Sequence, residues 1–469
     1  MAAMPTTLTH TTQAALDALR ASIQGAVIAP GDPEYDEARL AWNRAVDQRP
    51  ALIISAQTAA DIVEAVRFAR GVGMGIAVQS TGHGVVVPAD GAMLILTARL
   101  LDVAIDAESQ TAWVGAGVKW GQVLEKAQAV GLAPLLGSSP GVGVVGYTLG
   151  GGMGWLARKY GMALDSVLRF EIVTADGRLI EASASKNSDL FWALRGGGGG
   201  FAIITGMEIK LYPVATVFGG DMVYPIEVAR EVYTRYRDWI ATAPDELTSS
   251  IVTMNFPPIP QVPEILRGKT GVILRGCYTG PVDEGQALIQ TWYDWMPPLA
   301  SSFRAMPFSE VASISKDPLQ PSPGVSSGGW LTDLDDDTID TILRYAVASH
   351  GSPLTVTEVR HAGGAISRVA PDANAFGHRD APLVLSLIGM APTPDRKARM
   401  EQYMAEFKQA LAPHLSGVYM NFLGGAEARA RTQDAYSEAT YRRLMAIKAR
   451  YDPDNVFRYA FAINPAADA

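Results

Sequence analysis

Apolar and polar positions in the first part of the chain follow a pattern that predicts strands joined by helices. A short β-rich run at 50–56 precedes Thr58 and a stretch whose apolar residues recur at the i, i+3, i+4 and i+7 spacing of one helix face. Those apolar residues are Ile62, Ala65, Val66 and Ala69. Glycines then end the stretch, and the apolar run 76–78 begins another strand. This order predicts a βαβ unit with a crossover helix.

The same pattern continues to about residue 205. Further strands are expected at 93–97, 111–118 and 201–205, and short helices at 120–130 and 188–194. The segment 170–181 carries Asp176-Gly177 between two apolar runs, which is a strong signal for a β-hairpin.

The pattern changes near Pro213. From there to about residue 425, glycine clusters become rare, while aromatic residues and proline-rich loops become frequent. Long alternating runs at 270–278, 354–361 and 382–388 predict an antiparallel sheet with helices on one face. The segment 434–450 is expected to be helical, with Pro453 preventing its continuation. The change near Pro213 therefore marks a candidate domain boundary.

Length and charge narrow the class of protein. A chain of 469 residues exceeds what one hydrophobic core usually supports, so two domains are expected. The net charge of -9 argues against nucleic-acid binding, which requires a basic surface. The N-terminal segment lacks the pattern of a signal peptide, and no run of about 18 apolar residues could span a membrane. We therefore expect a cytoplasmic monomer or homodimer that contacts neither membrane nor nucleic acid.

The single cysteine, Cys277, excludes a disulfide framework, a cysteine zinc site and a CxxC redox pair. It lies in the alternating run 271–278, where a free cysteine usually acts as a small buried hydrophobe. The six histidines show no paired ligand spacing such as HExxH, so no metal site is expected.

Three glycine-rich stretches, at 80–84, 137–154 and 196–200, carry the candidate chemistry. Glycines let backbone N–H groups approach an anion closely, so two such loops can together hold an extended, phosphate-bearing ligand. Gly141-Val-Gly-Val-Val-Gly146 also has the spelling of a nicotinamide dinucleotide fingerprint. That fingerprint needs a strand-turn-helix frame, whereas this string follows a turn and leads into glycines that we expect not to begin a helix. An NAD-dependent dehydrogenase therefore stays an alternative.

Five motifs are similar to those of a known family. They are Val78-Gln-Ser-Thr-Gly-His-Gly84, Gly137-Ser-Ser-Pro-Gly-Val-Gly-Val-Val-Gly-Tyr-Thr-Leu-Gly-Gly-Gly-Met-Gly-Trp155, Arg158-Lys-Tyr-Gly161, Asp189-Leu-Phe-Trp-Ala-Leu-Arg-Gly-Gly-Gly-Gly-Gly-Phe201 and Tyr451-Asp-Pro-Asp-Asn-Val-Phe457. In this order they resemble the vanillyl-alcohol oxidase superfamily, specifically its berberine bridge enzyme-like group. The resemblance covers the chain from about residue 30 to residue 465.

The resemblance implies an α+β, two-domain PCMH-type FAD-binding fold. Residues 1–213 would form the FAD-binding domain, with its PCMH-type core at about 46–213. Residues 214–425 would form an antiparallel-sheet substrate domain that covers the flavin, and residues 426–469 would return to the FAD domain. The first boundary agrees with the change of pattern near Pro213.

The resemblance also implies how FAD is held. In this family the histidine of the first glycine loop is bonded to the 8α-methyl carbon of FAD, and His83 has that position. Many members add a second link from a cysteine, but here that position is Ser139, so a single link without a cysteinyl bond is expected. The chain departs from the usual pattern at Gln79, Thr81, Tyr147, Ala460 and Ala462.

The candidates for FAD contact come from both loops, from one strand and from the C-terminal segment. They are Gln79, Ser80, Thr81, Gly82, His83, Gly84, Ser139, Gly143, Gly146, Tyr147, Gly150, Gly151, Gly154, Ile204 and Tyr459.

This cofactor implies an FAD-dependent oxidoreductase. Flavin accepts a hydride at N5, while the protein supplies a base for the accompanying proton. The family includes oxidases of sugars, alkaloids and polyketide-like natural products. A covalently bound flavin suits oxidation of an alcohol or phenol-type, natural-product-like substrate with O2 as the electron acceptor. The aromatic middle segment favours a flat or phenolic substrate over a sugar. A dehydrogenase or oxygenase with another acceptor, and a noncatalytic FAD-binding protein, stay as alternatives.

The resemblance leaves the proton acceptor unassigned, because many relatives have a tyrosine where this chain has Phe422, which cannot take a proton. The remaining candidates are Tyr147, Tyr419, Glu358 and His361. Glu358 and His361 should lie on opposite faces of a regular strand, so at most one faces the flavin. Glu358 is the better base if it is buried, because desolvation would raise its pKa toward neutrality.

Overall fold

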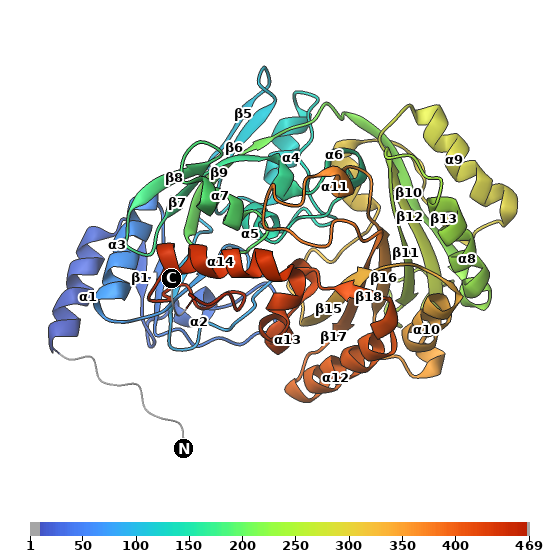
Figure 1. The fold of residues 1–469 in the computed structure, drawn as a ribbon. Coiled ribbons are helices and arrows are strands. Elements are labelled where there is room, and N and C mark those ends of the chain that lie inside the picture. The colour runs from blue at the N-terminus through green and yellow to red at the C-terminus, as the bar shows by residue number, and fades with distance from the viewer. Residues whose placement is uncertain (1–9, 467–469) are drawn as a thin grey trace.

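The fold is described by a computed structural model for residues 10–466, and it combines helices with three sheets (Figure 1). The α+β class expected from the sequence is confirmed. The two smaller sheets lie in the first half of the chain, and the largest sheet lies beside them with its own layer of helices (Figure 1). The start of the N-terminal segment considered above lies outside the described residues.

The first sheet has four strands in the order β1-β2-β4-β3. Its strands are β1 (Ala26–Ile28), β2 (Leu52–Ser55), β3 (Ile76–Gln79) and β4 (Met93–Leu96), of which β2, β4 and β3 run parallel. The helices α1 (His10–Ser22) and α3 (Ala59–Gly71) share a core with it, and α2 (Tyr35–Ala38) precedes β2. Thr58 caps α3 in a capping box with Asp61. The βαβ unit is confirmed, although β4 lies between its two strands.

The second sheet is antiparallel and has the order β5-β6-β9-β7-β8. Its strands are β5 (Val103–Asp106), β6 (Thr111–Gly115), β7 (Val167–Val173), β8 (Leu179–Ser183) and β9 (Ile203–Lys210). The helices near it are α4 (Trp120–Gln128), α5 (Val144–Leu149), α6 (Ala157–Tyr160) and α7 (Ser188–Leu194). The hairpin predicted from Asp176-Gly177 is confirmed, because β7 and β8 pair across it.

The third sheet has nine antiparallel strands, in the order β13-β10-β12-β11-β16-β17-β15-β18, with β14 paired to β10. They are β10 (Thr216–Pro225), β11 (Leu247–Asn255), β12 (Thr270–Tyr278), β13 (Ala300–Ser301), β14 (Arg304–Pro307), β15 (Gly324–Leu331), β16 (Val356–His361), β17 (Leu383–Met390) and β18 (Leu415–Gly417). The helices α8 (Ala229–Ile240), α9 (Val282–Trp295), α10 (Asp336–Ala346) and α12 (Pro394–Ala410) share its core. They form the outer layer of this half (Figure 1). The shorter helices are α11 (Ala365–Arg368) and α13 (Gly425–Ala430).

The two faces of the nine-stranded sheet differ in polarity. Ile251 and Leu274 pair across β11 and β12 and belong to the core under the helices. The neighbouring pair, Ser250 and Arg275, points to the opposite face because side chains alternate along a strand. Glu358 on β16 joins that second face, where its carboxylate contacts both residues. The sheet therefore presents buried polar and charged side chains on the face away from its helices.

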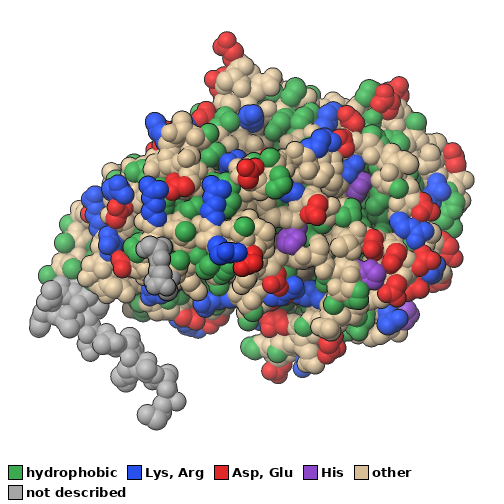
Figure 2. Space-filling view, in the orientation of Figure 1, with side chains coloured by type: hydrophobic (Ala, Val, Ile, Leu, Met, Phe, Trp, Pro, Cys, Tyr) green, Lys and Arg blue, Asp and Glu red, His purple; other side chains and the backbone are tan. Residues whose placement is uncertain are grey.

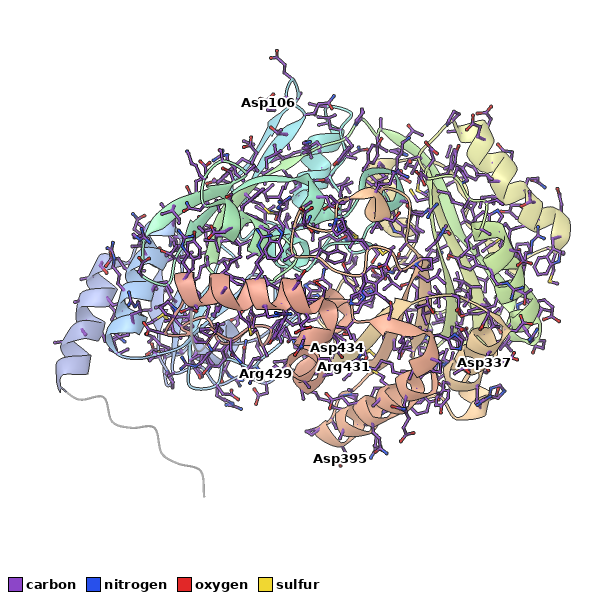
Figure 3. The ribbon with its side chains drawn as sticks, in the orientation of Figure 1. Asp106, Asp337, Asp395, Arg429, Arg431 and Asp434 are labelled. Atoms are coloured by element: carbon purple, nitrogen blue, oxygen red, sulfur yellow. The ribbon has the colours of Figure 1, made fainter. Side chains whose placement is uncertain are left out.

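The end of the chain returns to the first half. α14 (Glu438–Tyr451) packs against α7, and Ile76 donates a backbone hydrogen bond of 2.8 Å to Val456. Helix α14 begins at Glu438, later than predicted, because residues 432–435 form a 3-10 turn. In that turn, the Arg431 Nε and Asp434 Oδ2 atoms lie 2.8 Å apart, and both residues are labelled in Figure 3.

Arg158 on α6 joins the first half of the chain to the nine-stranded sheet. Its Nε donates a hydrogen bond of 2.8 Å to the Leu247 carbonyl, and its Nη1 contacts the Ala362 carbonyl and lies 3.0 Å from His361 Nε2. Since a guanidinium can only donate, His361 accepts through Nε2 and is the neutral tautomer. Burial and the Arg158 charge lower the pKa of His361 to about 3. His361, a candidate proton acceptor from the sequence, therefore takes part in the contact between the first half of the chain and the nine-stranded sheet.

His361→Gln should reduce the sensitivity of the fold to acid. In the unfolded chain a histidine takes up a proton near pH 6.5, whereas folded His361 does so near pH 3, so its stabilisation is lost as the pH falls from 6.5. Between pH 6.5 and 4.5 this loss is about 2 kcal/mol for the wild type and absent for glutamine, which cannot be protonated. Urea unfolding at both pH values measures the difference, with exposed His350→Gln as the control. If the free energy of unfolding changes with pH equally in His361→Gln and in the wild type, the lowered pKa of His361 is refuted.

The expectations from composition and charge concern the single cysteine and the protein surface. Cys277 on β12 is 0 % exposed, and burial raises the pKa of its thiol. Both observations agree with its predicted role as a small buried hydrophobic residue. Acidic and basic side chains are intermixed over the face seen in Figure 2. Within residues 10–466, no helix is both long and apolar enough to cross a bilayer.

Candidate functional site

The two glycine loops predicted to grip one ligand lie against each other. A Cβ atom on Gly143 would stand 3.2 Å from Ser80 Oγ and 3.6 Å from the Thr81 methyl carbon, so the two loops are in close contact there. Gly143 is the N-cap of α5, which lies partly within the glycine string, while the glycines at 150–154 that follow begin no helix, as expected. No strand occurs at residues 134–142, so the frame of a nicotinamide dinucleotide fingerprint is absent there.

His83 lies at this junction with one ring nitrogen engaged and the other free. Its Nδ1 is 2.8 Å from Thr81 Oγ1, whereas its buried Nε2 has no hydrogen-bond partner among the described residues. The imidazole stacks on Trp42, with ring centroids 4.2 Å apart and planes inclined by 16°. Burial, together with the charge of Lys119, lowers the pKa of His83 to about 4. His83 is therefore a neutral imidazole at physiological pH.

Other buried polar atoms in this region also lack partners. Ser80 Oγ and Tyr147 Oη have no hydrogen bond within the described part of the chain. Burial raises the pKa of the Tyr147 phenol well above its ordinary value, so it is protonated. Buried polar groups normally have partners, and such unpaired groups beside exposed glycine backbone point to a ligand. The residues present thus fit FAD, whose ring and phosphates supply acceptors, donors and negative charge.

Tyr419 and Asn421 fix the second glycine loop. The Tyr419 hydroxyl oxygen accepts hydrogen bonds from the backbone N–H groups of Gly152 and Met153, at 3.0 and 3.2 Å. Asn421 Nδ2 donates to the same oxygen at 3.2 Å and to the Tyr147 carbonyl at 2.9 Å. Burial raises the pKa of Tyr419 despite these donors. Strand β18 ends at Gly417 and residues 420–422 form a 3-10 turn, so Tyr419 lies between these two elements.

The other predicted cofactor contacts divide into two groups. Gln79 is engaged within the protein, since its Oε1 accepts from Gln48 and its Nε2 donates to the Leu40 carbonyl. Ile204 is 3 % exposed within the core, and the Tyr459 hydroxyl donates to the Asp90 carbonyl. The remaining loop candidates differ in exposure: Gly150 and Gly151 are buried, whereas Gly82, Gly84, Ser139, Gly146 and Gly154 are at least partly exposed.

Glu358 is buried, as the base hypothesis required, but it is paired with cations. Its Oε2 accepts a hydrogen bond of 2.8 Å from Arg360 Nε, and its Oε1 accepts from Ser250 at 2.8 Å. Arg275 Nη1 lies 3.4 Å from Oε1. Burial favours the protonated acid, but Arg360, Arg275 and Ser250 outweigh it and hold the pKa below its ordinary value. The expected rise of this pKa is therefore wrong.

Three residues that the sequence did not single out complete the site. Asn421 links the two tyrosines, and its place in the Tyr-x-Asn motif was the available signal. Arg275 reaches Glu358 from a strand 83 residues away, and Trp42 reaches His83 from outside any predicted element. Neither of these contacts has a local pattern, because each depends on how distant segments pair.

Comparison with known proteins supports FAD as the cofactor. Residues 50–183 match the model of an FAD binding domain, and residues 418–464 match the model described as berberine and berberine like. An FAD-linked oxidoreductase of Bacillus subtilis, YgaK, is 29% identical over 456 residues, covering 95% of this chain and 98% of that protein. A xylooligosaccharide oxidase of Thermothelomyces thermophilus is 26% identical over 488 residues, covering 97% and 96%.

The fold is also similar to that of a solved oxidase. The crystal structure of 6-hydroxy-D-nicotine oxidase from Arthrobacter nicotinovorans superposes with a TM-score of 0.83 and 25% identity, covering 95% of this chain and 99% of that chain. The matched FAD and berberine-like segments contain the two glycine loops and the Tyr419–Asn421 turn, respectively. The chain is therefore an FAD-linked oxidoreductase, and its C-terminal segment is similar to that of the berberine bridge enzyme-like group.

Proposed function

We propose that this enzyme is an oxidase that carries one FAD bonded to His83, oxidises an alcohol or phenol-type substrate, and passes the electrons to O2. The observation that carries the proposal is the unpaired, buried Nε2 of a neutral imidazole where two glycine loops meet. A neutral ring nitrogen is the form of histidine that can bond to an electrophilic carbon. Ser139 supplies no thiolate, and Cys277 is buried on β12, which supports a single link.

When bound, FAD would accept the hydride taken from the substrate. Ser80, Thr81 and the loop at 143–151 would hold the cofactor, with backbone N–H groups available for its phosphates. The proposed division is residues 1–213 and 426–469 for the cofactor and 214–425 for the substrate. The charged face of the nine-stranded sheet would then look onto the substrate, and Glu358 and Arg360 would present hydrogen-bonding groups to a substrate hydroxyl.

The acid–base roles follow from protonation states. Tyr147 and Tyr419 are protonated phenols at neutral pH, so each can donate a hydrogen bond but is a weak proton acceptor. Tyr419 already receives three N–H groups, which suits it to fix the loop. Tyr147 has a hydroxyl without a partner, which suits it to a substrate oxygen. Glu358 is ionised, and its ion pairs suit it to orient Arg360.

Glu358→Gln should weaken both the fold and the reaction. Breaking a buried ion pair leaves Arg275 and Arg360 without their carboxylate, so unfolding should require about 3 kcal/mol less free energy. Flavin reduction should slow by about ten-fold or more because Arg360 loses its orientation. Urea unfolding and anaerobic stopped-flow measure the two effects. Glu208→Gln is the control, since Glu208 has a partly exposed ion pair with Arg169.

The pH dependence of flavin reduction shows whether Glu358 orients Arg360 or accepts the proton itself. If Glu358 acts through Arg360, the reduction rate of Glu358→Gln keeps the pH dependence of the wild type at a lower level. If the wild-type rate falls at low pH and the rate of the variant does not, Glu358 is instead the proton acceptor. Unchanged stability and unchanged reduction would contradict both roles.

The proposed reaction is tested by the absorbance spectrum of the purified protein under anaerobic conditions. A panel of alcohols, phenols, hydroxylated N-heterocycles and oligosaccharides is added, because the relatives named above are oxidases of hydroxynicotine and of xylooligosaccharides. A substrate should bleach the flavin bands, and admission of air should restore them with release of hydrogen peroxide. Bleaching that air does not reverse would identify a dehydrogenase with another acceptor.

A further inference from the structure

The segment 41–44 is clamped between the His83 loop and the nine-stranded sheet. On one side, the backbone N–H groups of Trp42 and Asn43 donate to the carbonyls of Thr81 and Gly82, at 3.0 and 3.1 Å. On the other, Asn43 exchanges two side-chain hydrogen bonds with Gly324 at the start of β15, at 2.9 and 3.2 Å. The position of Trp42 is therefore fixed by contacts with both halves of the protein.

This clamp holds the indole of Trp42 flat against the His83 imidazole. The near-parallel stack, with centroids 4.2 Å apart, leaves one face of the imidazole covered. Gly82 makes the approach possible, because a Cβ atom there would lie 2.7 Å from the Cα atom of Ala41, and its φ of +77° favours glycine. Thr81 Oγ1 restrains rotation of the ring through Nδ1. The ring is thus held in a single orientation by a stack and a hydrogen bond.

The stack also affects the charge of the ring. Burial is the main cause that lowers the pKa of His83, with Lys119 at the N-cap of α4 as the charged group acting on it. Trp42 contributes to this burial because its indole replaces water on one face of the imidazole. A smaller side chain would admit water there and would free the ring to rotate.

We propose that Trp42 is a positioning residue for flavin attachment: its indole, together with the Thr81 hydroxyl, fixes the His83 imidazole for bonding to the flavin methyl carbon. This inference rests on the proposed covalent link. The net step forms one N–C bond and breaks one methyl C–H bond and one imidazole N–H bond. The two electrons and two protons that are released pass to O2, which becomes hydrogen peroxide.

The test compares Trp42→Leu with Trp42→Phe. Trp42→Leu should lower the fraction of flavin that stays with the polypeptide after acid precipitation by about ten-fold, because an unrestrained ring reaches the bonding geometry rarely. Trp42→Phe keeps an aromatic face and should retain most of the attachment. In both variants the total FAD content and the melting temperature should stay near those of the wild type. Trp239→Leu, which removes a half-buried indole from α8, is the control for loss of a tryptophan.

Each other outcome overturns a defined statement. Acid-stable flavin at the wild-type level in Trp42→Leu would refute the role of Trp42 while leaving the His83 link intact. No acid-stable flavin in the wild type would refute the link itself. Loss of total FAD from both Trp42 variants would make Trp42 a binding residue and would equally overturn its role in attachment. If Trp42→Leu does not fold, Thr81→Val decides, since it should lower attachment without removing the stack.

Discussion

His83→Ala is expected to abolish the flavin that survives acid precipitation. In the wild type the precipitated protein should stay yellow and should fluoresce in a denaturing gel, because a carbon–nitrogen bond resists unfolding. In the variant the same flavin should appear in the supernatant. The contacts proposed for Ser80, Thr81 and the loop at 143–151 would be retained, so FAD should still bind to the folded variant, although less tightly. The measurement is the flavin absorbance of pellet and supernatant at equal protein concentration.

Two further variants decide whether His83 is the single point of attachment. Ser139→Ala and Cys277→Ala should both keep a yellow pellet, because neither position offers a link in the proposed model. Cys277→Ala should also keep turnover within a few-fold, since the thiol is buried on β12. A colourless wild-type pellet would contradict the covalent model while leaving FAD binding intact. Residual acid-stable flavin in His83→Ala would place a second link elsewhere.

Much of the first half could be predicted because its signals are local. Thr58 before an apolar stripe placed α3, and Asp176-Gly177 placed the β7–β8 hairpin. What remained open was the order in which strands pair. The sequence predicted a βαβ unit, but the insertion of β4 between β2 and β3 depends on packing that no short pattern encodes. No helix was predicted within the glycine string at 141–146, yet the six-residue helix α5 begins there.

The sequence predicted those residues of the candidate site that lie in recognisable motifs. His83, Ser80 and Tyr147 lie in motifs, and each has a buried side-chain atom that lacks a hydrogen-bond partner among the described residues. Glu358 was found from strand alternation, yet the direction of its pKa depends on Arg275, which reaches it through the pairing of β12, β11 and β16. A sequence reveals that a carboxylate is buried more readily than which charges are buried beside it.

Tyr147 offers the cleanest test of catalysis because its hydroxyl can be removed without breaking a hydrogen bond. The Tyr147 hydroxyl has no partner within residues 10–466, while its ring packs edge-on against Trp120, with centroids 5.6 Å apart. Tyr147→Phe keeps that packing and removes a buried, unpaired polar atom, so stability should be unchanged or slightly higher. Any loss of activity then reports on substrate or cofactor contact and not on the fold.

We expect Tyr147→Phe to slow flavin reduction by about ten-fold or more, the usual effect of removing a positioned proton donor. Anaerobic stopped-flow absorbance with the substrate found in the panel measures the rate. Tyr212→Phe is the matched control: its hydroxyl bonds to Ser166 at 2.8 Å, so it should lose about 1 kcal/mol of stability and keep the wild-type rate. Tyr147→Phe should thus lower the reduction rate without lowering stability, and Tyr212→Phe should lower stability without lowering the rate. Wild-type reduction by Tyr147→Phe would mean that its hydroxyl serves neither substrate nor proton transfer, and the acid–base assignment would pass to the Glu358–Arg360 pair.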